Sequence, residues 1–164
     1  MARPLYAQLS LPALRANVAR ARALAPGTEL LAVVKANAYG HGLMRLLPAL
    51  TEADGLALLE LDAAIALRAA HYLRRILLLE GFFTPDELPE VAARRLAVVV
   101  HSEDQVRMLE LARLERPLEV FVKVNTGMNR LGVAPAAVAA LVERLSHCES
   151  VAVLRLMMHF ARAD

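Results

Sequence analysis

The feature that most constrains the fold of this chain is a regular alternation of short apolar runs with longer stretches of helical periodicity. We expect strands at Leu30–Val34, Leu56–Leu59, Ile76–Leu79, Leu96–Val100, Glu119–Val124 and Val151–His159. We expect helices near Ser10–Ala25, Leu43–Thr51, Leu61–Tyr72, Pro85–Ala93, Glu103–Leu114 and Pro135–His147. Val- and Leu-rich strands separated by helices are typical of an α/β fold, in which helices cover a parallel sheet.

Two architectures satisfy this order of elements, an open doubly wound sheet and a (β/α) barrel, because right-handed crossovers allow both. A complete eight-unit barrel takes about 250 residues, whereas these 164 residues provide about six βα units. The last apolar run is followed only by Phe160–Asp164, which is too short to form a covering helix. We therefore expect either an open sheet or an incomplete barrel. No Gly/Ser-rich linker or close repeat marks an internal domain boundary.

Composition excludes several classes of protein. Hydrophobic residues make up 57% of the chain and charged residues 22%, which is too apolar for a disordered chain. No apolar run approaches the length of about 20 residues that a membrane-spanning helix needs. Met1–Pro4 carries a charge but no apolar segment follows it, so we expect no secretory signal and a cytoplasmic location.

Charge and cysteine content point away from nucleic acid and metal. The 19 Lys and Arg residues are scattered among 17 Asp and Glu residues, and aromatic residues are few. A nucleic-acid interface needs a concentrated basic face with stacking aromatics, so we expect none. The single cysteine, Cys148, excludes an internal disulfide and a Cys-rich zinc site. The histidines do not have metal-ligand spacing, so no metal is expected.

Two of the expected helices have favourable starts. Thr84 is followed by Pro85 and, three residues on, by Glu87, which predicts a capping box. Ser102 and Gln105 have the same spacing and predict the same arrangement, with the Gln105 side chain reaching back to the helix start.

Lys35 comes directly after the expected first strand, and Ala36–Gly42 follows it in the order Ala-Asn-Ala-Tyr-Gly-His-Gly. The carboxyl ends of parallel strands bind ligands in α/β folds, and a neutral lysine amine there can form a Schiff base with a carbonyl. Gly40 and Gly42 allow close approach of the backbone to a ligand, and Tyr39 offers a hydroxyl donor. This pattern suits a pyridoxal phosphate site. A surface lysine before an ordinary glycine-containing turn is the alternative.

The same segment resembles the cofactor-lysine signature of the bacterial alanine racemases, and further segments resemble that family in the same order. These segments are Leu77–Phe83, His101–Ser102 with Gln105, Val122–Gly132 and His159–Asp164. Ordered matches along a whole chain are far more specific than one short motif. The chain is therefore identified as similar to the N-terminal, pyridoxal-phosphate-binding part of that family.

The resemblance implies a TIM-type (β/α) barrel, of which residues 1–164 form the N-terminal portion, with pyridoxal 5'-phosphate at the mouth of the barrel. It implies an isomerase that interconverts L-alanine and D-alanine, supplies D-alanine for cell-wall peptidoglycan and works as a homodimer. Lys35 would hold the cofactor as an internal aldimine and then act as one of two opposed proton-transfer bases. Tyr39 matches the tyrosine that hydrogen-bonds the cofactor phosphate.

Three further residues acquire roles from the same resemblance. Arg130 matches the arginine that contacts the phenolic oxygen of the cofactor and helps to receive the substrate carboxylate. Lys123 matches a lysine that is often carbamylated, which would turn a cation beside Arg130 into an anion that orients it; unmodified, the two would repel each other. His159 matches a histidine packed by the cofactor ring, although an ordinary core histidine at a strand end is an equal alternative.

The chain also departs from the family. Met158 stands where most relatives have Thr or Ser, and Asn125 where many have Asp. The last barrel strands and a C-terminal β domain, which in the family brings the opposing tyrosine base, are missing from residues 1–164. We therefore expect this chain alone to be inactive and to expose an unclosed barrel edge. A racemase of broader amino-acid range and a non-catalytic fragment that binds pyridoxal phosphate are the alternatives.

Overall fold

The computed structural model describes residues 5–162. The expectation at Met1–Pro4 and the last two residues of the segment ending at Asp164 lie outside the described residues. The strands are β1 (Leu31–Val33), β2 (Gly55–Leu58), β3 (Arg75–Leu78), β4 (Ala97–Val100), β5 (Leu118–Val124) and β6 (Val151–Met158). All six expected strands are therefore confirmed, with ends shifted by at most one residue.

The helices also follow the expected order, with some divided into shorter pieces. The longer ones are α1 (Leu11–Leu24), α4 (Leu61–Ala69), α5 (Leu88–Ala93), α6 (Glu103–Leu111) and α7 (Val138–Ser146). The shorter ones are α2 (Lys35–Tyr39), α3 (Leu43–Leu46), η1 (Leu47–Ala49), η2 (Pro85–Glu87) and η3 (Pro135–Ala137). The expected helix at Leu43–Thr51 is thus α3 followed by η1, while α2 was not expected from the sequence.

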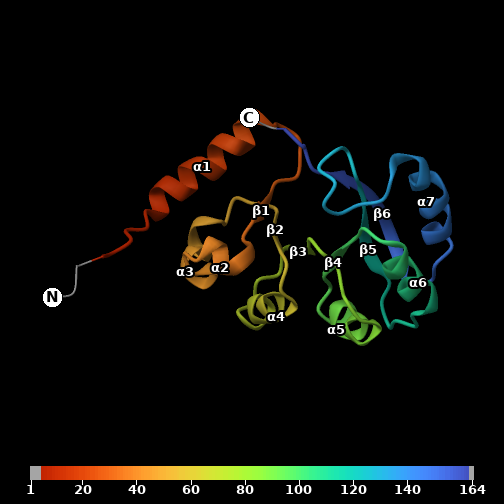
Figure 1. Ribbon diagram of the computed structural model, residues 1–164. Coiled ribbons are helices and arrows are strands. Elements are labelled where there is room, and N and C mark those ends of the chain that lie inside the picture. Colours follow the sequence, from red (N-terminus) through yellow and green to blue (C-terminus); the bar gives the residue numbers. More distant parts are fainter. Residues whose placement is uncertain (1–4, 163–164) are drawn as a thin grey trace.

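The order of the strands decides between the two architectures. The sheet runs β1-β2-β3-β4-β5-β6 and every neighbouring pair is parallel. A doubly wound sheet reverses its strand order at a switch point, whereas here each strand lies beside the next one in the sequence (Figure 1). The described residues therefore form six consecutive parallel strands of a (β/α) barrel, with helices following the first five. Within residues 5–162 no pairing joins β1 to β6, so the barrel is not closed.

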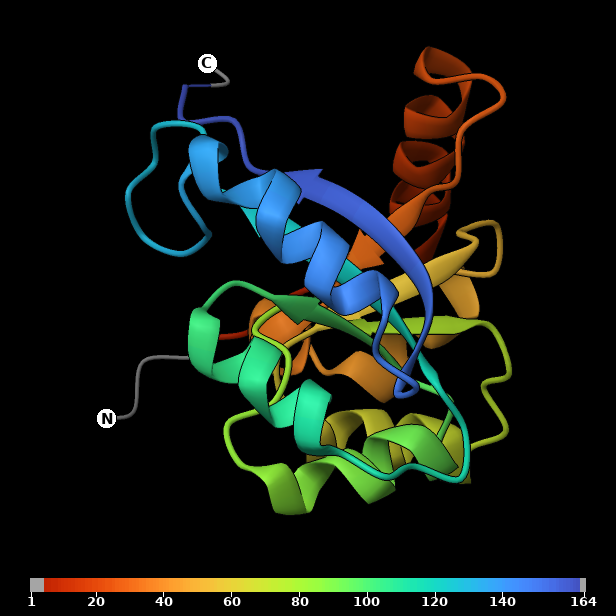
Figure 2. The same ribbon diagram turned by 90° about the vertical axis from the view of Figure 1, so that its right-hand side faces the viewer.

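The two faces of the curved sheet carry different side chains. On β5, Leu118, Val120 and Val122 are buried in the large cluster beneath the helices. Figure 2 shows α7 lying across β5 and β6, with α6 and α5 following on the same outer side. The inner face carries a smaller cluster made of alternate strand residues, namely Ala57, Leu77, Ala97 and Val99 with Leu31, Leu79, Phe121 and Met157 packed against it. Such inward-pointing residues form the layered interior of a barrel.

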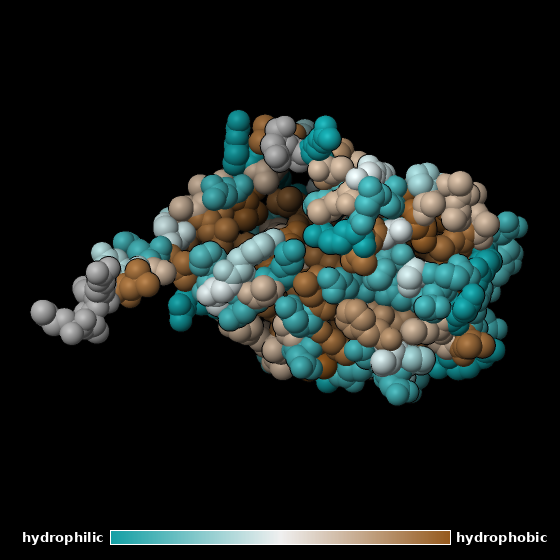
Figure 3. Space-filling view, in the orientation of Figure 1, coloured by the Kyte–Doolittle hydropathy of each residue, from teal (hydrophilic) through white to brown (hydrophobic). Residues whose placement is uncertain are grey.

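The two border strands leave apolar residues exposed. Val33 of β1 is 45% exposed, and Leu156 and Met158 of β6 are 63% and 44% exposed. Figure 3 shows hydrophobic surface, in brown, gathered around a hollow in the upper part of the view. Exposed edge strands are templates for pairing with another chain, so the expectation of an unclosed edge is confirmed. Among residues 5–162, no helix has both the length and the apolar character needed to cross a lipid bilayer.

Of the two predicted helix starts, one is confirmed and one is partly wrong. The Glu87 carboxylate accepts hydrogen bonds from the N–H groups of Phe83 and Thr84, at 2.6 Å and 3.4 Å. Ser102 also caps as predicted, through a 3.4 Å bond from the N–H of Gln105. The Gln105 side chain, however, does not bond to Ser102. It is 4% exposed and joins the tops of two strands instead, since it accepts from the His101 N–H and donates to the carbonyls of Glu80 and Phe82.

Candidate active site

Lys35 lies two residues beyond the end of β1 and begins a left-handed turn. Ala36, Asn37 and Ala38 have φ values of 50°, 52° and 55° with ψ values of 50°, 48° and 53°, and Tyr39 has a φ of 56°. Left-handed helical conformation costs an L-residue about 1–2 kcal/mol relative to the right-handed form, and normally occurs at single residues. Four such residues in succession therefore form an unusual and strained backbone segment. Strain of this kind concentrates at functional sites.

Hydrogen bonds from inside and outside the turn hold this conformation. The N–H of Ala38 donates to the Val34 carbonyl at 2.9 Å, and the N–H of Gly40 donates to the Ala36 carbonyl at 2.8 Å. The Asn37 side chain accepts from the N–H of Leu43 at 2.8 Å. The Ala36 N–H donates out of the segment, to the Glu60 carboxylate at 3.2 Å.

The turn brings the predicted lysine and tyrosine together. The Lys35 Nζ atom lies over the Tyr39 ring, 6.0 Å from its centroid. Lys35 is half-buried and Tyr39 is 59% exposed, so both polar groups lie at the surface of the sheet's carboxyl end. The amine can react with an aldehyde group of a ligand, and the neighbouring phenol can donate a hydrogen bond to an anionic group of the same ligand.

Lys123, Arg130 and His159 form the second part of the site. The three residues line one small hollow at the carboxyl ends of β5 and β6, together with Asn125 and Thr126. Lys123 is only 8% exposed, and this burial, helped by the neighbouring Arg130 charge, lowers the pKa of the Lys123 amine below its ordinary value. Lys123 and Arg130 therefore lie close enough for the charge of Arg130 to act on the Lys123 amine.

The loop after β5 is built around Asn125. Backbone bonds of 2.9 Å join Asn125 and Lys123 to Val133 and close the ends of the loop. Inside it, the Asn125 Oδ1 atom accepts from the N–H groups of Gly127 and Asn129, both at 3.1 Å. The Asn125 Nδ2 atom donates to the side-chain oxygen of Asn129 at 3.0 Å. An Asp at position 125 could not make this last bond, because an ionised carboxylate has no hydrogen to donate.

This loop carries Arg130 and is attached to the end of β6. The Thr126 hydroxyl donates to the His159 carbonyl at 3.0 Å, while the Arg130 side chain is exposed. At the closed end of the loop, Gly132 has a φ of +117°, and a Cβ atom there would approach the Asn125 nitrogen to 2.8 Å. Only glycine suits that position.

The structure places the predicted site residues at one end of the sheet, in two groups. Lys35 and Tyr39 lie at the end of β1, and Lys123, Arg130 and His159 lie at the ends of β5 and β6. Among the described residues, no hydrogen bond or shared hollow connects the two groups. Both groups nevertheless lie at the carboxyl ends of parallel strands, the end that forms ligand sites in barrels.

Sequence reasoning assigned no site role to Asn37 and Glu60. Asn37 lies within the recognised segment, but its side-chain bond to Leu43 could not be inferred from spacing. Glu60 has a clearer signal, because it is a carboxylate two residues beyond the end of β2, at the same end of the sheet as Lys35.

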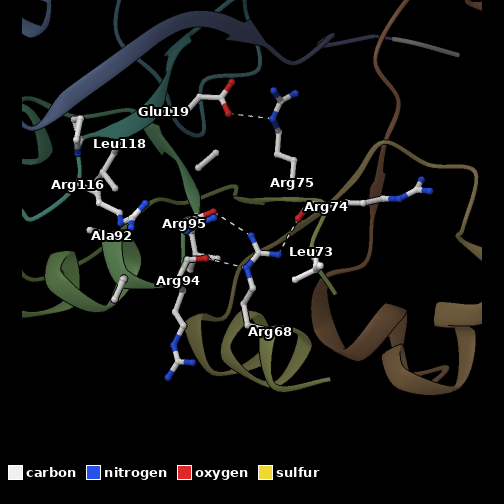
Figure 4. A pocket seen from close by; sticks show the side chains of 14 residues that line it. Arg68, Leu73, Arg74, Arg75, Ala92, Arg94, Arg95, Arg116, Leu118 and Glu119 are labelled. Atoms are coloured by element: carbon white, nitrogen blue, oxygen red, sulfur yellow. Dashed lines mark hydrogen bonds and ion pairs between the residues drawn. The ribbon is translucent and has the colours of Figure 1, made fainter. Parts of the chain in front are cut away.

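A large hollow lies at the opposite, amino end of the strands (Figure 4). It measures about 740 Å³ and several arginines line it. The guanidinium of Arg68 donates to the carbonyls of Tyr72, Arg74, Arg94 and Arg95 at 2.6–3.0 Å, so it ties the ends of two helices to the strands that follow them. At the amino end of a barrel such features contribute to stability, and we do not assign the candidate site there.

Comparison with known proteins agrees with this geometry. The family model described as "Alanine racemase, N-terminal domain" matches residues 9–164. The chain is 50% identical to an alanine racemase of Nitrosospira multiformis over 164 residues, which is 100% of this chain and 46% of that protein. The crystal structure of the biosynthetic alanine racemase of Pseudomonas aeruginosa has a TM-score of 0.89 and 44% identity, covering 94% of this chain and 43% of that one.

The structure of a racemase named for a different amino acid is also similar to this chain. Histidine racemase from Leuconostoc mesenteroides has a TM-score of 0.82 and 26% identity, covering 94% of this chain and 43% of that one. The chain thus spans a little under half the length of these relatives. The match over nearly the whole of its own length is decisive, and the chain belongs to the alanine racemase N-terminal domain family.

Proposed function

We propose that this chain is the cofactor-binding barrel portion of an alanine racemase, which uses pyridoxal 5'-phosphate to interconvert L-alanine and D-alanine. The observation that carries the proposal is the left-handed turn that places Lys35 and Tyr39 side by side at the carboxyl end of the sheet. Within the whole enzyme, we propose a cytoplasmic homodimer that supplies D-alanine for peptidoglycan. The similarity to proteins named alanine racemase supports this choice of substrate.

The residues present fit the proposed cofactor. Lys35 offers a primary amine for an aldehyde, Tyr39 a hydroxyl donor for a phosphate, and Arg130 an exposed planar guanidinium for an anionic oxygen. His159 lines the same hollow as Arg130, where it can pack against a ring. When bound, pyridoxal phosphate supplies a conjugated system that spreads the negative charge left when the α-proton of an amino acid is removed.

The side chains of this chain then have distinct tasks. The freed Lys35 amine takes or returns the proton at the α-carbon on one face of the substrate. Arg130 receives the substrate carboxylate, since its fork of donors matches two carboxylate oxygens. Burial favours the neutral form of the Lys123 amine, and a neutral amine is the form that carbamylation requires. We propose that the carbamylated group orients Arg130 from behind.

The open barrel supports the further proposal that the 164-residue chain does not racemise alanine by itself. Racemisation by two opposed bases needs a second base on the other face of the substrate, and we propose that a residue outside these 164 supplies it. The unpaired edges of β1 and β6 are consistent with a site that other strands complete. A steady racemase rate from the purified chain would contradict this.

A second candidate is racemisation of a different amino acid. The similarity to a histidine racemase supports this second candidate, because proteins named for the two activities share one fold. A comparison of rates on alanine, histidine and serine in the complete enzyme separates the two candidates. A rate on histidine or serine above that on alanine would overturn the proposed substrate.

Borohydride trapping tests the cofactor site directly. The chain has only two lysines, Lys35 and Lys123, so peptide mass mapping after reduction with pyridoxal phosphate gives an unambiguous result. We expect the reduced adduct on Lys35, with buried Lys123 as the internal control. Labelling of Lys123 or the terminal amine without labelling of Lys35 would show that the site does not assemble as proposed.

A further inference from the structure

At the start of the left-handed turn, one backbone donor bonds to a side chain that lies just beyond the end of β2. The N–H groups of Ala38, Gly40 and Gly42 all bond to carbonyls at 2.8–2.9 Å within residues 34–42. The first N–H groups of any helical turn have no partner inside the turn. For Ala36, the residue next to Lys35, the partner is the Glu60 Oε1 atom at 3.2 Å.

Glu60 makes this contact in place of a more local one. It is the N-cap residue of α4, yet its side chain makes no capping bond to its own helix. Asp62 supplies the acidic residue in the first turn of α4 instead. A carboxylate at this position has N–H groups of α4 close by in sequence, so its bond to Ala36, 24 residues away, is a specific link between the ends of β1 and β2.

The link matters because the turn is strained. Ala36, Ala38 and Tyr39 are L-residues with no special tolerance for positive φ. A strained backbone persists only where its surroundings hold it. Asn37 fixes the turn from within, through Leu43. Among residues 5–162, Glu60 makes the only side-chain hydrogen bond between this turn and the end of the neighbouring strand β2.

We infer that Glu60 is a positioning residue for Lys35: its carboxylate holds the Ala36 N–H and thereby keeps the lysine backbone where the amine meets the aldehyde of pyridoxal phosphate. The inference rests on the proposed function. Glu60 touches neither the amine nor the cofactor in this role, and it acts through one backbone hydrogen bond. A Gln at position 60 keeps the side-chain oxygen that accepts this bond, whereas an Ala removes it.

The test compares three variants of the 164-residue chain, namely Glu60→Ala, Glu60→Gln and Asp62→Ala. The last is the matched control, because Asp62 is an exposed carboxylate at the same helix start with no bond to the turn. The readout is the fraction of Lys35 trapped by borohydride at subsaturating pyridoxal phosphate. We expect Glu60→Ala to lower it about three- to fivefold, because the Ala36 N–H loses its acceptor at a site that water can partly reach. Glu60→Gln and Asp62→Ala should stay within about twofold of the parent chain.

A second measurement does not involve the cofactor. Amide hydrogen exchange at Ala36 should accelerate by about the same factor in Glu60→Ala and remain unchanged in Asp62→Ala. Unchanged exchange at Ala36 in Glu60→Ala overturns the inference, as does equal trapping of Lys35 in that variant and the parent. Loss of trapping in Glu60→Gln as large as in Glu60→Ala also overturns it, since charge rather than the bond would then be responsible. Absence of Lys35 trapping in the parent chain contradicts the proposed function instead, and the exchange measurement still decides the role of Glu60.

Discussion

The two ends of the sheet use their charged side chains in different ways. At the amino end one group of charges is paired inside the barrel: Arg75 bonds to both Glu29 and Glu119, and Glu119 also bonds to Arg155. These pairs join β3, β5, β6 and the segment before β1 across the inside of the barrel. Arg68 adds bonds to four carbonyls at the same end.

At the carboxyl end the cations have no such partners. Among residues 5–162, no carboxylate lies within ion-pair distance of Lys35, Lys123 or Arg130. Unpaired cations at one mouth create a positive potential that suits an anionic ligand. The barrel therefore keeps the residues that stabilise it at the amino end and the residues available to a ligand at the carboxyl end, as barrels generally do.

The sharpest way to test this separation is Lys35→Arg. The substitution keeps the positive charge but removes the primary amine, so trapping of pyridoxal phosphate at position 35 should fall to background. Stability should hardly change, within about 0.5 kcal/mol, because the Lys35 amine has no ion-pair partner. Mass mapping and urea unfolding measure the two effects. A loss of stability as large as that from an amino-end arginine would break the comparison.

Arg68→Ala should have the converse effect. It leaves four carbonyls without their charged donor, so we expect the free energy of unfolding to fall by about 3 kcal/mol. Lys35 trapping per folded molecule should remain close to that of the parent chain. Arg68→Lys, which keeps the charge but cannot reach all four carbonyls, should give an intermediate loss. Urea unfolding followed by circular dichroism measures both variants, and loss of trapping in folded Arg68→Ala would contradict the separation.

The sequence predicted the strands well because burial determines them. Val- and Leu-rich runs such as Leu96–Val100 are favourable only where both faces of the strand are buried, so the run itself marks the strand. Accordingly, β4 begins within one residue of its expected start. The choice between an open sheet and a barrel could not be made from the same runs. It depends on which strands pair, and that is settled by long-range packing rather than by local pattern.

The sequence predicted candidate site residues that the structure places at one end of the sheet, but it did not predict their local geometry. Lys35, Tyr39 and Arg130 follow strands or glycine-rich loops that the sequence marks clearly. The left-handed turn was missed, because Ala36 and Ala38 have no local preference for positive φ and are held there by Asn37 and Glu60. Gln105 was misassigned for a similar reason, since its spacing fits a helix cap but its buried amide finds partners 23 and 25 residues away.

The buried lysine of the carboxyl end predicts a dependence of stability on pH. Burial lowers the pKa of Lys123 in the folded state below the unfolded value near 10.5. Between these two values the unfolded chain binds more protons, so this residue makes stability rise with pH through that window. Below the window its cost is constant, so Lys123→Met should be more stable than the parent chain there. The advantage should shrink as pH approaches 10.5. Urea unfolding of both chains across this range measures it, and a pH-independent difference would contradict the burial argument.

The smallest expected effect concerns the bond that ties the Arg130 loop to β6. Thr126→Val removes the hydroxyl that donates to the His159 carbonyl but nearly keeps the side-chain shape. Since both groups are exposed, water replaces part of the bond, and we expect a loss of only about 0.5 kcal/mol in the free energy of unfolding. The loop should nevertheless loosen locally, with faster amide exchange over residues 125–133 and none of the change reaching the Lys35 turn. Thr126→Ser keeps the donor and should behave like the parent chain. Equal amide exchange in Thr126→Val and Thr126→Ser would show that the Thr126 hydroxyl does not hold the loop. The bonds made by Asn125 and the backbone would then be sufficient, and the carboxyl ends of β5 and β6 would be coupled only by the pairing of the two strands.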